Sequence, residues 1–382
     1  MKKSIYLDYA AATPLDADVL KAMEPYFADD FHNPSAIYLA GRKARLALEQ
    51  ARAAVAKHLG ARTGEIVFTA GATEANNLAV QGVMKNFDGG EILVSAIEHE
   101  SVLAPAGLFN CRHVPVDKKG RLSLDKLAKL INDNTVLVSV GLVNNEIGSL
   151  QPLREIAQIL KRVSNSRGSR GLPLYLHTDA AQAANYFDLH VSRLGVDLMT
   201  INGGKIYGPK QTGVLYIRTG VKLQPLILGG GQESGLRSGT ENVAGAMGLA
   251  KALDRAQQLK QEENQRVGRL RDLFIAELAA KFPKAIINSV SKNQSPHILS
   301  VTFPGTDNER LMMELDEAGV QVAVGSACSA SSQEPSHVLK AIGLSNAQAQ
   351  ATLRFSFGRQ TTEENIIKTL NILQAILNKS SD

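Results

Sequence analysis

The sequence contains only two cysteines, Cys111 and Cys328, in 382 residues. They lie far apart and form no CxxC pair, so neither a zinc knuckle nor a disulfide framework is indicated. The segment Glu98-His99-Glu100 does not begin an HExxH zinc helix, because Leu103 follows His99 at the position of the second histidine. We therefore expect no bound metal and a reducing, cytoplasmic environment.

Long apolar runs are also missing. No segment reaches the roughly 18 consecutive apolar residues of a transmembrane helix, and Asp8 interrupts the first apolar run before it could form a signal-peptide core. The net charge of +5 is small for a chain of this length and does not indicate nucleic acid. The sequence predicts a cytoplasmic protein that contacts neither a membrane nor nucleic acid directly.

The common nucleotide-binding motifs are absent. The glycine-rich segments "GPKQTG" and "GGGQESG" do not satisfy the Walker pattern, and no GxGxxG opens a βαβ unit. Internal repeats, low-complexity tracts and flexible linkers are absent as well. The sequence therefore predicts a globular protein without a nucleotide-binding site of these kinds.

Short apolar runs of β character alternate with segments of helical period between residues 17 and 255. In "PLREIAQILKRV", for example, Ile156, Ile159, Leu160 and Val163 fall on one helix face. Strands without clean alternation, separated by helices, indicate a parallel sheet covered on both sides. The predicted strands are 65–70, 91–96, 135–143, 173–179, 196–201 and 213–218.

A second domain is expected beyond a long charged helix that begins near Val243. "HILSVTF", "VQVAVG" and "TLRFSF" predict strands of a smaller α+β unit, and "TTEE" at 361–364 fits a capping box at the start of the last helix. We expect a large domain over 17–255 and a small domain formed by 1–16 and 256–382, which carries Cys328.

Several reactive residues follow predicted strands directly, where open parallel sheets bind their ligands. The turn Gly71-Ala72-Thr73-Glu74 opens a helix and presents N–H groups to an anion, although a plain N-cap by Thr73 is an equal alternative. Asp179 ends a buried strand and needs a cation or several donors.

Two further residues are ambiguous when taken alone. His99 is more often a structural histidine, and Lys205 in "NGGK" is more often a surface turn lysine. A lysine desolvated among glycines can, however, become a nucleophile. An anion-binding turn, a strand-end aspartate and a nucleophilic lysine on successive strands together suit pyridoxal phosphate, which needs a phosphate site, a carboxylate at its pyridinium nitrogen and a Schiff-base lysine.

Nine segments together carry a resemblance to one family: "YLDYAAATP", "NPSAIYLAGRKAR", "FTAGATEANNLA", "VNNEIG", "HTDAAQA", "GKIYGPK", "GGGQESGLRSGT", "VGSACSASSQEPSHVLKAIG" and "LRFSFGR". In this order they resemble the cysteine desulfurases, in the class V aminotransferase group of fold-type I pyridoxal phosphate enzymes. The resemblance runs from about Ile5 to near residue 370. It implies an α/β fold with a mostly parallel seven-stranded sheet in the large domain and a smaller α+β domain.

The resemblance implies a cofactor role for individual residues. Lys205 would form the Schiff base and move the substrate Cα proton, Asp179 would pair with the pyridinium nitrogen, and Gln182 would bond the phenolic oxygen. His99 would stack on the ring and assist proton transfer. The other implied cofactor contacts are Ala72 and Thr73 at the phosphate, Asn145, Asn202, and Thr240 from the partner subunit of a homodimer.

Substrate roles follow from the same resemblance. Asn145 and Arg354 would bind the carboxylate of L-cysteine, for which a planar guanidinium is well shaped. Cys328 would attack the substrate sulfur and carry it as a persulfide to an acceptor, releasing alanine. Its small, polar neighbours predict a mobile loop, and the "SACSA" form resembles the long-loop branch of the family. Cys111, near a strand, is interpreted as a packing residue.

Three features depart from the family pattern. Gly204 stands where relatives carry a histidine that helps bind the phosphate, so weaker cofactor retention or compensation elsewhere in the phosphate site is expected. Tyr38 stands where relatives often carry histidine. The chain stops at "NILQAILNKSSD", without the extension that helps housekeeping members dock the iron–sulfur scaffold, which makes a tRNA-thiolating enzyme or a specialised cluster system a plausible acceptor.

Three alternatives stay open at this point. A selenocysteine lyase or cysteine C–S lyase of the same fold would release its product without a protein persulfide. A catalytically reduced homologue would act as an assembly or sulfur-relay subunit and bind no pyridoxal phosphate. A class V aminotransferase would depend on a keto acid and would be indifferent to Cys328.

Overall fold

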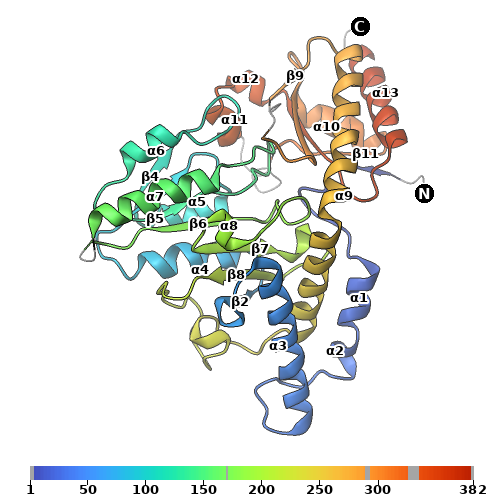
Figure 1. Ribbon diagram of the computed structural model, residues 1–382. Helices are drawn as coiled ribbons and strands as arrows, with labels where there is room; N and C mark the ends of the chain where they lie inside the picture. The colour runs from blue at the N-terminus through green and yellow to red at the C-terminus, as the bar shows by residue number, and fades with distance from the viewer. Residues whose placement is uncertain (1–3, 169–170, 289–292, 326–334, 380–382) are drawn as a thin grey trace.

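A computed structural model describes residues 4–168, 171–288, 293–325 and 335–379. Its central feature is a seven-stranded sheet in the order β2-β8-β7-β6-β5-β3-β4 (Figure 1). All neighbouring pairs are parallel except those made by β8, which is antiparallel to β2 and to β7. The strands are β2 Ile66–Thr69, β3 Glu91–Ser95, β4 Asn110–Val114, β5 Thr135–Ser139, β6 Tyr175–Asp179, β7 Leu198–Asn202 and β8 Gly213–Ile217.

The six predicted strands of this sheet are all present, and the predicted mostly parallel α/β fold is confirmed. The prediction missed β4. That strand reads NCRHV and lies at the sheet edge, where only Val114 is fully buried. An edge strand with polar side chains carries little of the apolar signal by which strands are recognised.

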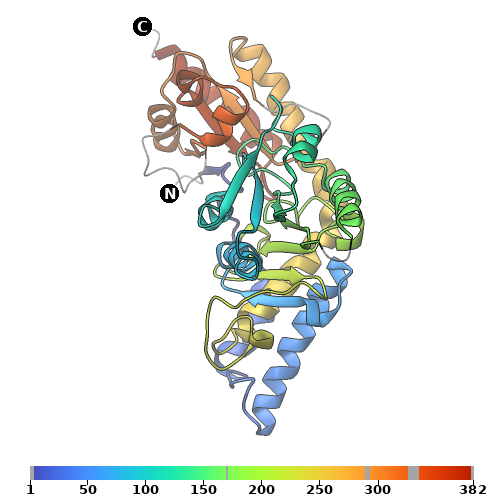
Figure 2. The same ribbon diagram turned by 90° about the vertical axis from the view of Figure 1, so that its left-hand side faces the viewer.

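Helices cover both faces of the large sheet (Figure 2). Ile92 and Val94 of β3 belong to the core beneath α4 and α5, which includes Val102. Leu93, between them, points to the opposite core, which includes Ile156 of α7. The helices of this part are α1 Ala17–Met23, α2 Pro25–Ala28, α3 Leu39–Leu59, α4 Ala72–Met84, α5 Glu100–Ala106, α6 Leu124–Leu130, α7 Leu153–Arg167 and α8 Val191–Leu194.

A second, smaller unit contains the three-stranded sheet β12-β10-β9 and the parallel pair β1-β11. Its core is built around Phe274, Phe355 and Phe357. Both chain ends lie at this unit (Figure 1). Its elements are β1 Ile5–Tyr6, β9 Ile286–Ile287, β10 Ile298–Thr302, α10 Asn308–Glu317, β11 Val320–Gln321, α11 His337–Ala341, α12 Asn346–Ala349, β12 Thr352–Ser356 and α13 Glu363–Lys379.

The helix α9, Val243–Lys281, joins the two units and begins at the predicted residue. Its residues up to Ala256 pack into the large core, and from Val267 onward they pack into the small core. The predicted domain division at residue 255 falls near this change, and it stays a prediction. No helix in the described ranges is both long and apolar enough to cross a bilayer.

The cap of the last helix differs from the predicted one. The reciprocal bonds join Thr362 and Asn365: the Thr362 N–H donates to Asn365 Oδ1 at 3.1 Å, and the Asn365 N–H donates to Thr362 Oγ1 at 3.2 Å. Thr361 instead accepts from the Gly358 N–H. The predicted pairing of Thr361 with Glu364 is therefore wrong by one residue, because an asparagine side chain fills the role that the sequence motif reserves for Glu or Gln.

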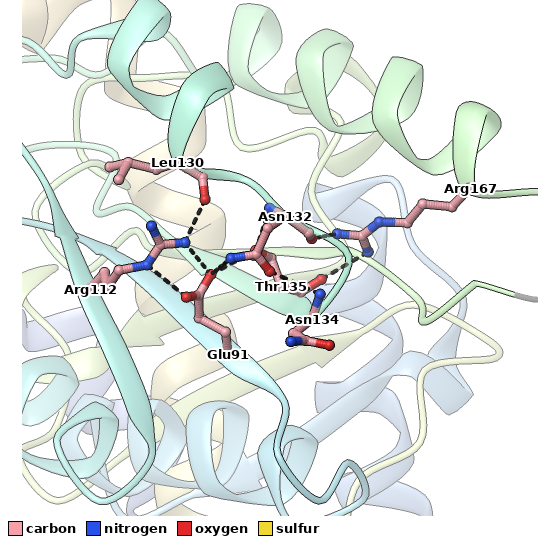
Figure 3. Close-up of polar contacts among 7 residues, drawn as sticks. All are labelled: Glu91, Arg112, Leu130, Asn132, Asn134, Thr135 and Arg167. Carbon is pink, nitrogen blue, oxygen red and sulfur yellow. Dashed lines mark hydrogen bonds and ion pairs between the residues drawn. The ribbon is translucent and has the colours of Figure 1, made fainter.

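A polar network lies at the amino ends of β3 and β5 (Figure 3). Glu91 is buried and accepts two hydrogen bonds of 2.6 Å from Arg112, one of 2.8 Å from the Thr135 hydroxyl and one of 3.1 Å from Asn132 Nδ2. Arg167 at the end of α7 donates to the carbonyl oxygens of Thr135 and Asn132. The network lies at the edge of the sheet opposite the carboxyl ends of the strands. It therefore stabilises the sheet without occupying the edge at which a ligand would bind.

Candidate active site

A cavity of about 250 Å³ lies at the carboxyl edge of the large sheet. Its wall comes from the segments that follow β2, β3, β5, β6 and β7, as expected for an open parallel sheet. Ala10 and Ala11 from the N-terminal segment and Arg354 from β12 complete it. The cavity therefore lies between the two units.

Most of the predicted site residues line this one cavity, although they come from distant parts of the sequence. They are Ala72, Thr73, His99, Asn145, Asp179, Gln182, Asn202, Lys205 and Arg354. Thr240 does not line it and is exposed in a separate hollow beside Arg237. Cys328 lies outside the described residues.

Lys205 ends the short 3-10 turn η2, Gly203–Lys205, directly after β7. The Asn202 side chain caps this turn by accepting from the Gly204 N–H at 3.0 Å. Lys205 Nζ donates to the Ala11 carbonyl at 2.5 Å, and Asn185 holds the Lys205 carbonyl oxygen at 2.8 Å. The lysine is half-buried. Its backbone and its amine are thus both fixed by neighbouring segments at the cavity wall.

Asp179, the last residue of β6, accepts two hydrogen bonds. Asn76 Nδ2 donates to Oδ2 at 2.7 Å, and the Ala181 N–H donates to Oδ1 at 2.8 Å. The same Asn76 nitrogen donates to the Ser101 hydroxyl at 2.8 Å. Because both donors favour the charged form of a carboxylate, this surrounding suits an aspartate that faces a cation.

His99 is the N-cap of α5 and lies 2.8 Å from the Ser101 hydroxyl through Nδ1. The Ser101 N–H also donates to Nδ1, at 3.1 Å. Since Nδ1 accepts from a backbone amide, the neutral ring carries its proton on Nε2. Ser101 and Asn76 thereby connect His99 to Asp179, so the two predicted site residues share one hydrogen-bond chain.

The N-terminus of α4 lies at one end of the cavity, where Ala72 and Thr73 line it. Its N-cap is Gly71, at φ 138°, and no side chain caps the first turn. The plain N-cap by Thr73 is therefore wrong, because Thr73 lies inside the first turn. An uncapped helix of this length presents backbone N–H groups and a partial positive charge to an anion. An adjoining hollow of about 600 Å³ shares Ala72, Thr73 and Lys205 and adds Lys210.

Arg354 on β12 is buried at the cavity wall. It donates to Asp8 Oδ1 at 2.6 Å and to the Asn145 carbonyl at 3.0 Å. Its Nε is buried and has no hydrogen-bond partner among the described residues. A guanidinium held at a cavity wall suits a carboxylate ligand.

Glu98 is a buried acid that the sequence prediction did not include in the site. Its pKa is raised to about 8, chiefly by burial and also by the nearby charge of Asp179, while a hydrogen bond from the Gly141 N–H acts in the opposite direction. Glu98 is therefore uncharged at neutral pH.

Sequence reasoning also missed Asn76, Ser101, His297 and Asp8, which hold the predicted residues in place. Asp8 lies in the quoted segment "YLDYAAATP", but its pairing with Arg354 spans 346 positions and has no local sequence signal. Cys111 is half-buried on β4 and packs against the core beneath α4, which confirms its packing role.

The residues present fit pyridoxal phosphate. An uncapped helix N-terminus suits the phosphate, Asp179 suits a protonated ring nitrogen, and Lys205 suits the aldehyde. Among the described residues, no group of three or more His, Cys, Asp or Glu side chains is placed to bind a metal ion. The donor set therefore favours an organic cofactor with an anionic group.

The chain is similar to known proteins along almost its whole length. The class-V aminotransferase family model matches residues 5–368. The chain is 42% identical to cysteine desulfurase IscS of Dictyoglomus turgidum over 99% of this chain and 96% of that protein. It is 41% identical to cysteine desulfurase IscS 1 of Archaeoglobus fulgidus over 98% of this chain and 97% of the relative. A solved NifS-like protein superposes with a TM-score of 0.91 at 34% identity, covering 98% of this chain and 99% of the other.

Proposed function

The chain belongs to the class-V aminotransferase family and is a pyridoxal-phosphate-dependent cysteine desulfurase, and we propose that Lys205, Cys328 and the cavity residues carry its reaction. The single observation that supports this assignment is the cavity itself. It places Lys205, Asp179, His99 and Arg354 around one space. The reaction converts L-cysteine to L-alanine and transfers the sulfur atom.

Four groups would hold the cofactor. The first turn of α4 with Thr73 would bind the phosphate, Asp179 the ring nitrogen, Gln182 the phenolic oxygen, and Lys205 the aldehyde carbon. When bound, pyridoxal phosphate supplies an electron-withdrawing ring that weakens bonds at the Cα and Cβ of the substrate. Asp179 would support that property by pairing with the ring nitrogen, because hydrogen bonds from Asn76 and Ala181 hold its carboxylate in place.

Substrate orientation falls to Arg354 and Asn145. Asp8 and the Asn145 carbonyl fix the guanidinium at the cavity wall, where it would bind the substrate carboxylate. Lys205 would move the Cα proton, since its side chain lines the cavity. His99 lies over the same space, and its Nε2–H can donate to the reacting group.

The sulfur step belongs to Cys328. Its thiolate attacks the substrate sulfur, forming an S–S bond while the Cβ–S bond breaks and its electron pair passes to the substrate carbon, which then takes up a proton. The balance is L-cysteine plus a Cys328 thiol giving L-alanine plus a Cys328 persulfide. Gly325 and Ser336 border the segment that carries Cys328, and Ser336 Oγ donates to the buried Glu146 at 2.5 Å.

The role proposed for Thr240 requires a homodimer, because this residue would bind the phosphate in the site of the partner subunit. The side chains of Phe31, Ile37, Leu39 and Leu46 are 60% to 85% exposed and gather before and along the start of α3. Such a collection of large apolar side chains is typical of an interface. Pairing there would bury the patch and allow the exposed Thr240 of one subunit to reach the phosphate site of the other.

The persulfide needs an acceptor thiol. We assign this part to a cytoplasmic sulfur acceptor, either an iron–sulfur scaffold or a tRNA-thiolating enzyme. The chemical requirement is a thiol that approaches the segment between Gly325 and Ser336. The iron–sulfur route is favoured by the similarity to IscS proteins.

The proposal is tested by alanine formation from L-cysteine with added pyridoxal phosphate and a reductant. We expect Lys205→Ala to abolish turnover, and borohydride reduction of the native protein to attach the cofactor to the peptide that contains Lys205. Attachment at another lysine, or normal alanine formation by Lys205→Ala, would refute the site.

A further inference from the structure

His297 is a buried residue that the proposed roles do not use. It lies directly before β10, and its side chain reaches from the small unit to Gln182, which follows β6 of the large sheet. We propose that His297 is a positioning residue that fixes the Gln182 amide with its nitrogen available to the phenolic oxygen of the cofactor. This inference rests on the cofactor site proposed above.

The orientation of the Gln182 amide follows from its two partners. Gln182 Nε2 donates to the Ala10 carbonyl at 2.9 Å, and a carbonyl oxygen can only accept. Gln182 Oε1 therefore faces His297 Nε2, 3.1 Å away. His297 must then carry its proton on Nε2 and donate it. The amide keeps one further N–H, and Gln182 lines the cavity.

The His297 ring is held from its other side as well. With the proton on Nε2, Nδ1 accepts from the hydroxyl of Ser295, which lies 2.5 Å away and is itself fully buried. Burial, together with the positive charge of Arg354, lowers the pKa of His297 to about 3, so the ring is neutral. The ring also stacks on Tyr186 with centroids 4.4 Å apart. Ser295 and Tyr186 thus hold the donor in a single arrangement.

The consequence concerns the phenolic oxygen. The negative charge of this oxygen would favour protonation of the nitrogen by which Lys205 holds the cofactor. A hydrogen bond from Gln182 would stabilise that negative charge and so lower the pKa of the nitrogen. Without His297, Gln182 Oε1 loses its donor and the amide loses its fixed orientation. The pH at which the absorbance of the bound cofactor changes should therefore rise.

The experiment is a spectrophotometric pH titration of the holoprotein. We expect His297→Phe, which keeps a ring against Tyr186, to raise the midpoint by about half a pH unit or more, as loss of one hydrogen bond implies. His297→Gln, which restores an N–H at similar reach, should return the midpoint toward the native value. Gln182→Ala should shift it at least as far, and His297→Phe combined with Gln182→Ala should add nothing.

A matched control separates positioning from stability. Thr302→Val removes a buried hydrogen bond of 2.7 Å to Thr352 from the same small sheet, so it should lower the unfolding temperature without moving the midpoint. An unshifted midpoint in both His297→Phe and Ser295→Ala would overturn the inference, as would additive shifts in the double variant. Failure of the cofactor site itself would instead appear as a native protein with no pH-dependent cofactor absorbance.

Discussion

Gly203 and Gly204 precede Lys205 but differ in what they tolerate. A Cβ atom on Gly203 would lie 2.2 Å from Thr212 Oγ1 and 2.9 Å from the Pro209 carbonyl, so only glycine fits. A Cβ on Gly204 would have no neighbour closer than 3.5 Å. Position 203 therefore requires glycine for steric reasons, whereas position 204 has room for the Cβ atom of a larger residue.

That room leads to the first prediction. Gly204→His should fold normally and place a donor beside the phosphate site, slowing the loss of pyridoxal phosphate on dialysis by roughly tenfold, the value of one hydrogen bond to a charged group. Gly204→Leu is the matched control, because it fills similar space without a donor. Equal retention in the two variants would show that the imidazole does not reach the phosphate.

The buried Glu98 should make the free energy of unfolding depend on pH. Its folded-state pKa of about 8 lies above that of an unfolded glutamate, so the folded protein binds more protons between about pH 4.3 and pH 8. This contribution to stability is present below pH 4.3 and is lost as the pH rises toward 8. Relative to Glu98→Gln, the native protein should therefore lose up to about 1.4 kcal/mol per pH unit across this window.

The measurement is the free energy of unfolding of both proteins at several pH values. Glutamine keeps an acceptor for the Gly141 N–H and mimics the neutral acid. A difference between the two proteins that stays constant from pH 5 to pH 8 would contradict a raised pKa for Glu98.

At this scale the sequence predicts which residues line the cavity better than which residues hold them in place. Asp179 and Lys205 were predicted because the first ends a strand and the second follows one, and strand ends meet at one edge of a parallel sheet. Asn76, Ser101 and His297 were not found, because their importance depends on contacts that only the folded chain creates. Thr240 and Cys328 rest on resemblance alone.

At the scale of elements, the polar network around Glu91 fixes the amino ends of β3 and β5 (Figure 3). Arg112→Ala would leave the buried Glu91 with hydrogen bonds from Thr135 and Asn132 only. We expect the free energy of unfolding to fall by about 2–3 kcal/mol, less than for a fully buried pair because Arg112 is partly exposed.

The control is Arg193→Ala, which removes an ion pair with Asp188 whose arginine is 69% exposed. Exposed pairs contribute less than about 1 kcal/mol, so its cost should be clearly smaller in the same urea titration. Equal costs for the two variants would mean that the network adds nothing beyond a surface ion pair.

The elements themselves were predictable where they are apolar and periodic. Each buried strand of the large sheet and the start of α9 were predicted from such patterns. The failures were β4 and the antiparallel direction of β8, which depend on edge position and on chain path, and local sequence does not report either.

At the scale of the whole molecule, the exposed apolar side chains near α3 predict self-association. Leu39→Glu changes a side chain that is 84% exposed, so it should leave the subunit folded. Charge in an apolar interface should make the protein monomeric in analytical ultracentrifugation and weaken cofactor retention, because Thr240 would no longer reach the partner. Leu108→Glu, at a leucine that is 69% exposed beyond α5, is the control that should keep the native association state. A dimeric Leu39→Glu protein would place the interface elsewhere.

In the proposed reaction, sulfur leaves L-cysteine through Cys328. The most direct measurement follows alanine and protein-bound persulfide together, from L-cysteine with a reductant, in the native protein and in Cys328→Ala. We predict that the native protein forms alanine repeatedly and carries a persulfide on the peptide that contains Cys328, whereas Cys328→Ala binds the cofactor normally but forms neither product. Alanine formation by Cys328→Ala at the native rate would contradict the account.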